Sequence, residues 1–213
     1  MMRLYAATTE ESFYLCKSQE KYQKLHFALA YFHSVLLERR KFGTLGLNIP
    51  YDFNDTDFEV SNDLLTTYLD EYEETPFDAL KFLISEANYG GRVTDEIDRR
   101  VLAAYLNQFY CPPILSVPNY ELSTLTAYHV PDDGTLQTHR EFIKTLPTTD
   151  RPEAFGQHAN ADIAFQLSDS RLLLQTIAGL QGGGGGGGSG AGAEELVLNI
   201  CQDLLLQMLL WKG

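Results

Sequence analysis

The sequence is poor in cysteine and in basic residues, and it lacks long apolar runs. Its three cysteines, Cys16, Cys111 and Cys201, are widely separated without metal-site spacing, so we expect reduced, intracellular thiols. The sequence contains no run of about 18 apolar residues, so no membrane-spanning helix is predicted, and the first residues lack a signal-peptide pattern. With 16 basic and 29 acidic residues, the net charge of −13 makes nucleic acid and anionic membranes unfavourable partners.

Motifs that bind phosphate or activate a nucleophile are also absent. The chain has no Gly-x-x-x-x-Gly-Lys-Ser/Thr segment and no apolar strand ending in Asp-Glu, so nucleotide hydrolysis lacks a phosphate-binding loop and a magnesium ligand. No Gly-x-Ser-x-Gly elbow occurs. His26 and His33 share one predicted helix without an acidic partner, which favours buried or surface histidines over a metal site. The sequence predicts no catalytic residue, no metal ligand and no cofactor.

What is present is a globular composition with a helical pattern. Hydrophobic residues make up 44% of the chain, enough for a core. Over residues 11–41, apolar side chains recur every three or four positions, which predicts one long helix with a cap at Thr8 or Thr9. The cations at 39–41 suit its last turn, where the helix dipole favours positive charge, and Gly43 ends it.

Similar patterns predict further helices over residues 57–73, 76–89, 94–110, 135–146 and 168–180. We expect Thr75 to cap the third helix with Pro76 at its first position, and Ile97 to lie on the buried side of the fourth. Thr135 is the expected cap of the next helix. The expected fold class is therefore mainly α, a helical bundle with a short strand or hairpin near residues 114–131.

The last part of the chain is a glycine run followed by an apolar segment. Residues 182–193 are almost all glycine with no Lys-Ser/Thr after them, which predicts a flexible linker rather than a phosphate-binding loop. Residues 194–213 predict a helix that is apolar nearly all round between Leu204 and Trp211. Because consecutive helical residues point in all directions, this segment needs cover, and we expect the chain to self-associate through it.

Three segments, in this order, resemble one family, the dynein heavy chain: ERRKFG at 38–43, LNIPYDFN at 47–54 and NYGGRVTD at 88–95. The resemblance runs from about Arg3 to Gln181. It identifies the chain as similar to the lid, or small helical subdomain, of the sixth AAA+ module. The string at 155–163 resembles the beginning of the family's C-terminal domain, and the versions at 48–51 and 158–163 look axonemal.

The resemblance implies a domain order and a role. It implies a lid-like helical domain at 1–155 and the start of the C-terminal region at 156–181, before the linker at 182–193 and the helix at 194–213. It further implies a non-catalytic structural part of a minus-end-directed, ATP-driven microtubule motor, packed in the AAA+ ring and relaying conformational change. The alternative hypothesis is a stand-alone helical protein-interaction module.

The resemblance also implies partners and a location. The direct partners would be the rest of the dynein AAA+ ring and the C-terminal domain. Other dynein subunits and microtubules would be reached only through the parent motor. The implied location is the cytoplasm and cytoskeleton, in the axoneme of a cilium or flagellum.

Arg92 is the candidate cofactor-binding residue. In many AAA+ lids an arginine at the N-terminus of a late lid helix points at bound nucleotide (the sensor-2 position), and Gly90-Gly91-Arg92 resembles that placement. A guanidinium there could form paired hydrogen bonds with phosphate oxygens, and an enzyme regulated through Arg92 is a third hypothesis. The alternative is that Arg92 pairs with a carboxylate such as Asp95 or Asp98, or with one on a neighbouring subdomain. The resemblance favours this alternative, because the family's sixth module is regarded as non-hydrolysing.

Overall fold

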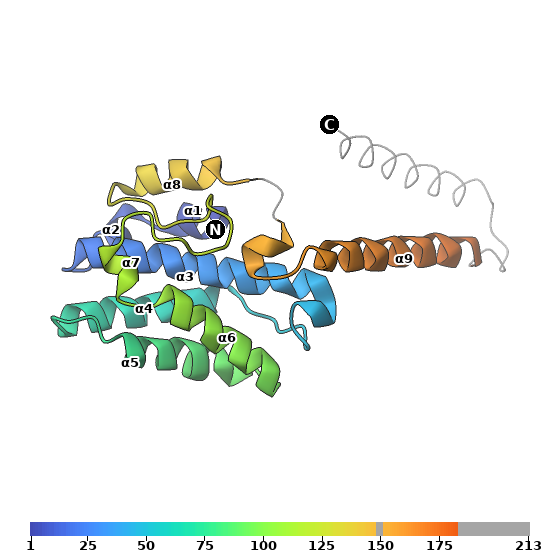
Figure 1. The fold of residues 1–213 in the computed structure, drawn as a ribbon, viewed down its shortest axis with the longest axis horizontal. Coiled ribbons are helices and arrows are strands. Elements are labelled where there is room, and N and C mark those ends of the chain that lie inside the picture. The colour runs from blue at the N-terminus through green and yellow to red at the C-terminus, as the bar shows by residue number, and fades with distance from the viewer. Residues whose placement is uncertain (148–150, 183–213) are drawn as a thin grey trace. The chain divides into compact units, whose positions relative to one another are not determined.

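The computed structural model describes residues 1–147 and 151–182, and within them the chain is helical (Figure 1). No β-sheet is present in this part; one isolated antiparallel bridge joins Glu121 to His129. The mainly α expectation is therefore confirmed, and the strand or hairpin expected near 114–131 is present only as that bridge. The helices are α1 Met2–Ala7, α2 Glu10–Phe13, α3 Gln19–Arg39, η1 Arg40–Leu45, α4 Asp55–Glu71, α5 Phe77–Phe82, η2 Leu83–Asn88, η3 Gly90–Arg92, α6 Glu96–Phe109, α7 Pro113–Ser116, α8 Leu136–Thr145, η4 Pro152–Phe155 and α9 Asn160–Gly182.

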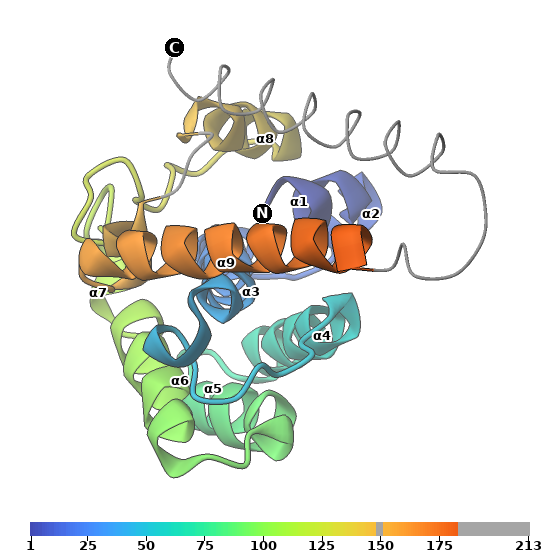
Figure 2. The ribbon, with the colours of Figure 1, turned by 90° about the vertical axis from the view of Figure 1, so that its right-hand side faces the viewer.

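The contacts divide the chain into two compact units, Met1–Asp162 and Ile163–Gly213. In the first unit, α3 runs through the centre, with α1, α2 and α8 on one side and α4, α5 and α6 on the other (Figures 1 and 2). The predicted stripe of α3 is buried, and so is its opposite face, where Phe27, Tyr31 and Val35 lie. A helix that is covered from both sides carries apolar side chains on both faces, so the predicted stripe accounts for only part of its buried surface.

The long first helix begins later than predicted. Thr9 caps the separate helix α2 by accepting a hydrogen bond from the Ser12 amide, but the chain then leaves the helix and α3 starts at Gln19. Asp70, at the end of α4, holds this break: its Oδ1 accepts the Lys17 amide at 2.8 Å. A carboxylate far along the chain decides the break, so local periodicity could not show it.

Two further details differ from the sequence predictions. Pro76, rather than Thr75, is the N-cap residue of α5, and no side chain caps that helix. Ile97 is 61% exposed on α6, whereas Leu102 and Leu106 face the core. The Thr135 cap of α8 is confirmed, since its side chain accepts the Thr138 amide.

Helix α9 starts at Asn160, earlier than the expected residue 168, and continues to Gly182. Beyond Asp162 it exposes large apolar side chains, among them Ile163, Leu172 and Leu174. The rest of the glycine run and the apolar segment at 194–213 lie outside the described residues, so the predictions for them stay predictions. None of the described helices has the length and apolar character needed to cross a membrane.

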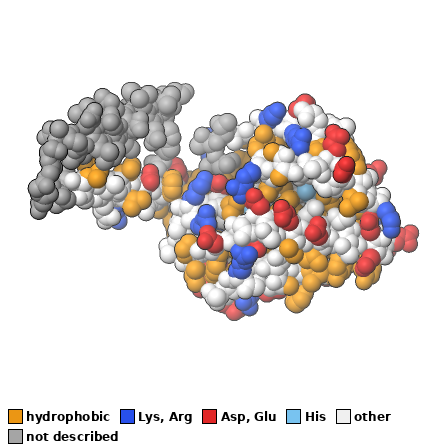
Figure 3. All heavy atoms as spheres, turned by 180° about the vertical axis from the view of Figure 1, so that it is seen from behind, with side chains coloured by type: hydrophobic (Ala, Val, Ile, Leu, Met, Phe, Trp, Pro, Cys, Tyr) orange, Lys and Arg blue, Asp and Glu red, His pale blue; other side chains and the backbone are white. Residues whose placement is uncertain are grey.

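The surface of the first unit mixes both signs of charge. On the face drawn in Figure 3, acidic and basic side chains are interspersed with apolar ones, so the acidic excess is not gathered into one patch there.

Candidate functional site

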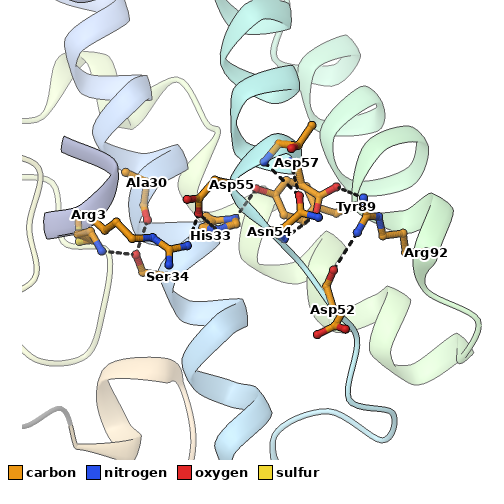
Figure 4. A network of polar contacts seen from close by, with 12 residues as sticks. Arg3, Ala30, His33, Ser34, Asp52, Asn54, Asp55, Asp57, Tyr89 and Arg92 are labelled. Atoms are coloured by element: carbon orange, nitrogen blue, oxygen red, sulfur yellow. Dashed lines mark hydrogen bonds and ion pairs between the residues drawn. The ribbon is translucent and has the colours of Figure 1, made fainter. Parts of the chain in front are cut away.

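Arg92 ends the short helix η3 and closes over a buried carboxylate (Figure 4). Its Nη2 lies 3.0 Å from Oδ1 of Asp57, and its Nη1 donates a hydrogen bond of 2.8 Å to the Asp52 carbonyl. The Asp57 side chain is 4% exposed, whereas that of Arg92 is 44% exposed. The charged end of Arg92 is thus directed to a partner inside the chain.

Asp57 also organises the start of α4. The Asn54 side chain accepts the Asp57 amide, and Asp57 Oδ2 accepts the Asn54 amide at 2.9 Å, which together form a capping box. Asn88 of η2 donates through Nδ2 to the Asp57 carbonyl and to Ser61 Oγ, both at 2.7 Å. Arg92 and Asn88 therefore fix the η2–η3 segment to the first turn of α4.

Asp95 and Asp98, the two carboxylates named as examples of partners for Arg92, bind other groups, and Asp57 is the carboxylate that pairs with it. Asp95 caps α6 by accepting the amides of Ile97 and Asp98, and it also accepts Asn48 Nδ2. The amide of Asp98, then the Asn48 side chain, hold the pKa of Asp95 below its usual range. Asp98 is buried and accepts the amides of Asn48 and Ile49 at 2.9 and 3.2 Å.

The placement of Arg92 also differs from the prediction. It lies in its own short helix, and residues 93–95 separate it from α6, so it is not at the start of that helix. Main-chain amides of the loop at 46–50 donate hydrogen bonds to the Asp98 carboxylate, and Arg92 pairs instead with Asp57 of α4.

Arg39, at the end of α3, is buried, unlike Arg92, and the sequence analysis does not predict its role. Its side chain donates through Nε to the Gly46 carbonyl at 2.9 Å and through Nη1 to the Phe155 carbonyl at 2.8 Å. Nη1 also lies 2.7 Å from the Tyr105 hydroxyl, and the guanidinium carbon is 5.5 Å from the centre of that ring. The signal was present: Arg39 follows Leu36 by three residues and so continues the apolar stripe.

Three histidines are buried in the core rather than arranged as ligands: His26, His33 and His139. Burial lowers the pKa of each to about 4. His33 Nδ1 bonds to the Tyr89 hydroxyl at 2.8 Å, and Figure 4 shows His33 between Asp55 and Tyr89. In the described residues no three His, Cys, Asp or Glu side chains form a group that could hold a metal ion.

A family model described as "Dynein heavy chain AAA lid domain" matches residues 22–161, more than half of the chain. The chain belongs to this dynein heavy chain family. The matched stretch contains Arg39, Asp57 and Arg92 together with the helices that carry them, so both arginine clusters lie inside the lid.

Curated relatives agree with the dynein heavy chain family. The chain is 61% identical, over 98% of its length, to "Dynein-1-beta heavy chain, flagellar inner arm I1 complex" of Chlamydomonas reinhardtii. It is 56% identical over 85% of its length to "Dynein axonemal heavy chain 2" of Mus musculus, and 42% identical over 93% to "Dynein axonemal heavy chain 12" of Rattus norvegicus. It spans 4–6% of the length of these relatives.

Substituting Arg92 tests whether the lid depends on this ion pair. We expect Arg92→Ala to lower the free energy of unfolding by about 1–3 kcal/mol, because Asp57 loses its cation while staying buried. Urea denaturation followed by circular dichroism measures this. Arg100→Ala is the matched control: its pair with Glu96 is exposed, and its loss should cost less than about 0.5 kcal/mol. Equal effects of the two substitutions would contradict the expectation.

Proposed function

We propose that the chain is the lid of the sixth AAA+ module of an axonemal dynein heavy chain, and a non-catalytic structural part of a microtubule motor. The observation that carries the non-catalytic role is the engagement of Arg92. Its guanidinium, the group that resembles a nucleotide sensor, is held by Asp57 and by the Asp52 carbonyl. A phosphate group would have to displace a buried carboxylate that has no other cation within 4 Å among the described residues.

The lid would act by moving as one body. A central helix covered on both faces and an ion pair at the start of α4 resist internal deformation. Rigid-body rotation of packed domains is an established way of carrying a conformational change between sites. The lid would pack on its large subdomain and on neighbouring ring parts, and would respond to ATP bound at other modules.

The partners follow from this placement. They are the rest of the AAA+ ring and the C-terminal domain, with other dynein subunits and microtubules reached through the parent motor. The words "flagellar" and "axonemal" in the names of the relatives support a location in the cytoskeleton of a cilium or flagellum.

Titration with nucleotide tests the non-catalytic role. We expect isothermal calorimetry of the 213-residue chain with Mg-ATP to show no micromolar binding, because no phosphate-binding loop is present and Arg92 is already paired. Wild type and Arg92→Ala should therefore give the same flat titration. Micromolar affinity that disappears in Arg92→Ala would establish Arg92 as a nucleotide sensor instead.

The genomic sequence upstream of the chain tests its placement in the ring. We expect an in-frame AAA+ large subdomain directly before Met1. An intact, independently expressed gene with no such neighbour would favour the stand-alone interaction module.

A further inference from the structure

Arg39 is a buried cation without an acidic partner among the described residues, and it donates hydrogen bonds to three separate segments. Its side chain binds the Gly46 carbonyl, the Tyr105 hydroxyl and the Phe155 carbonyl. These acceptors come from the loop after η1, from helix α6 and from the end of η4. The residue itself is 8% exposed.

The acceptors explain why the charge is tolerated in the core. A buried cation is costly unless hydrogen bonds replace its water. Phe155 ends η4 and Gly46 directly follows η1, and the last carbonyls of a helix have no partner within that helix. Arg39 donates to both carbonyls, so these helix ends supply acceptors that replace the water around its charge.

A second set of hydrogen bonds holds the turn at residues 154–157, next to the Arg39 side chain. Tyr105 also donates its hydroxyl hydrogen to the Phe155 carbonyl. Tyr31 of α3 donates to the neighbouring Ala154 carbonyl at 2.6 Å, and both groups are buried. Gln157 Nε2 reaches the Leu45 carbonyl at 3.2 Å. The turn at 154–157 is thereby tied to α3, to α6 and to the loop that Arg39 binds.

The tied turn lies where the lid passes into the segment that opens α9. Residues 154–157 are followed within a few positions by Asn160, the first residue of that helix. We propose that Arg39 is the positioning residue of a joint between the lid and this segment, through which displacement of α3 and α6 is passed to residues 156–162. The proposal rests on the relay role of the lid proposed above.

Hydrogen exchange in the 213-residue chain tests the joint. Arg39→Lys keeps the charge, but an ammonium on a flexible stem cannot reproduce the planar fork that spans these acceptors. We expect the amides of Ala154, Gly156, Gln157 and Ala161, which are hydrogen-bonded to carbonyls at 151–158, to exchange at least tenfold faster, with α1 and α8 unchanged. Tyr105→Phe should show the same pattern with a smaller effect.

Arg140→Lys is the matched control. Arg140 of α8 also donates to two main-chain carbonyls, those of Tyr5 and Thr8, at 2.9 Å each. We expect this variant to speed exchange in α1 and α8 and to leave residues 152–161 unchanged. If Arg39→Lys loosens the whole unit evenly, or if Tyr105→Phe leaves the turn as protected as in the wild type, the joint is refuted.

The intact heavy chain, in its motor complex, tests the coupling. We expect Arg39→Lys to keep basal ATPase within twofold while microtubule-stimulated ATPase and gliding velocity fall at least threefold, with Arg140→Lys normal in all three. Faster exchange at 152–161 with an unchanged motor would refute the coupling and with it the relay role of the lid. Unchanged exchange would refute the joint and leave the proposed relay function standing.

Discussion

Gly46→Ala is expected to destabilise the lid by about 3 kcal/mol or more, at the upper end of overpacking effects. A Cβ atom on Gly46 would lie 1.8 Å from the Arg39 carbonyl oxygen and 2.7 Å from its carbon. Both are main-chain atoms at the end of α3, so no side chain can rotate to make room. The movement that relieves the overlap would also pull the Gly46 carbonyl from the Arg39 side chain.

Chemical denaturation followed by circular dichroism at the helical band measures this loss. Gly91→Ala is the control, because a Cβ atom on Gly91 would meet no atom within 4 Å and its backbone does not require glycine. It should leave the free energy of unfolding unchanged, or raise it by up to about 1 kcal/mol through the unfolded state. A Gly46→Ala protein as stable as Gly91→Ala would show that the loop at 46–50 adapts freely.

Acid is expected to unfold the chain well above the pH at which its carboxylates protonate. Burial lowers the pKa of His26, His33 and His139 from 6.5 to about 4, so the folded state holds the neutral rings while the unfolded state takes up protons. Folded pKa values that are depressed give stability that is complete above pH 6.5 and is lost as the pH falls toward 4. Each histidine contributes on the order of 3 kcal/mol across that window.

Thermal or urea unfolding at half-unit steps between pH 7.5 and 4.5 measures this dependence. His139→Phe should flatten it, because the His139 ring stacks on Tyr5 and meets Phe13 and Phe27, while neither of its nitrogens has a hydrogen-bond partner. If stability is flat between pH 7 and 5, these rings are not held neutral by burial.

Local sequence patterns gave correct answers where one segment decides its own structure. Thr135 is followed by a helix whose third amide it caps, and Thr9 does the same for α2. The stripe along α3 named core residues correctly, since Leu25, Leu29 and Leu36 are fully buried. Periodicity and capping act over a few residues, so both are legible in an isolated sequence.

The same patterns failed where a distant side chain decides. Asp70 breaks the predicted first helix by binding the Lys17 amide. Asp57 forms the ion pair with Arg92, although Asp95 and Asp98 are nearer to Arg92 in the sequence. The sequence predicts that Arg39 interacts with the helix dipole, whereas its guanidinium binds acceptors from three other segments. Any of several carboxylates or carbonyls could have met these groups, and spacing along the chain does not rank them.

The sequence by itself determined the helical class, the likeness to a dynein lid and the lack of a phosphate-binding loop, because each depends on residue types at fixed local spacing. The tertiary structure alone decided that Arg92 faces Asp57 and that Arg39 joins α3, α6 and η4. The physical reason is that a charged side chain in a folded protein goes to whichever unsatisfied oxygen the packed helices bring within reach, and that depends on the whole arrangement.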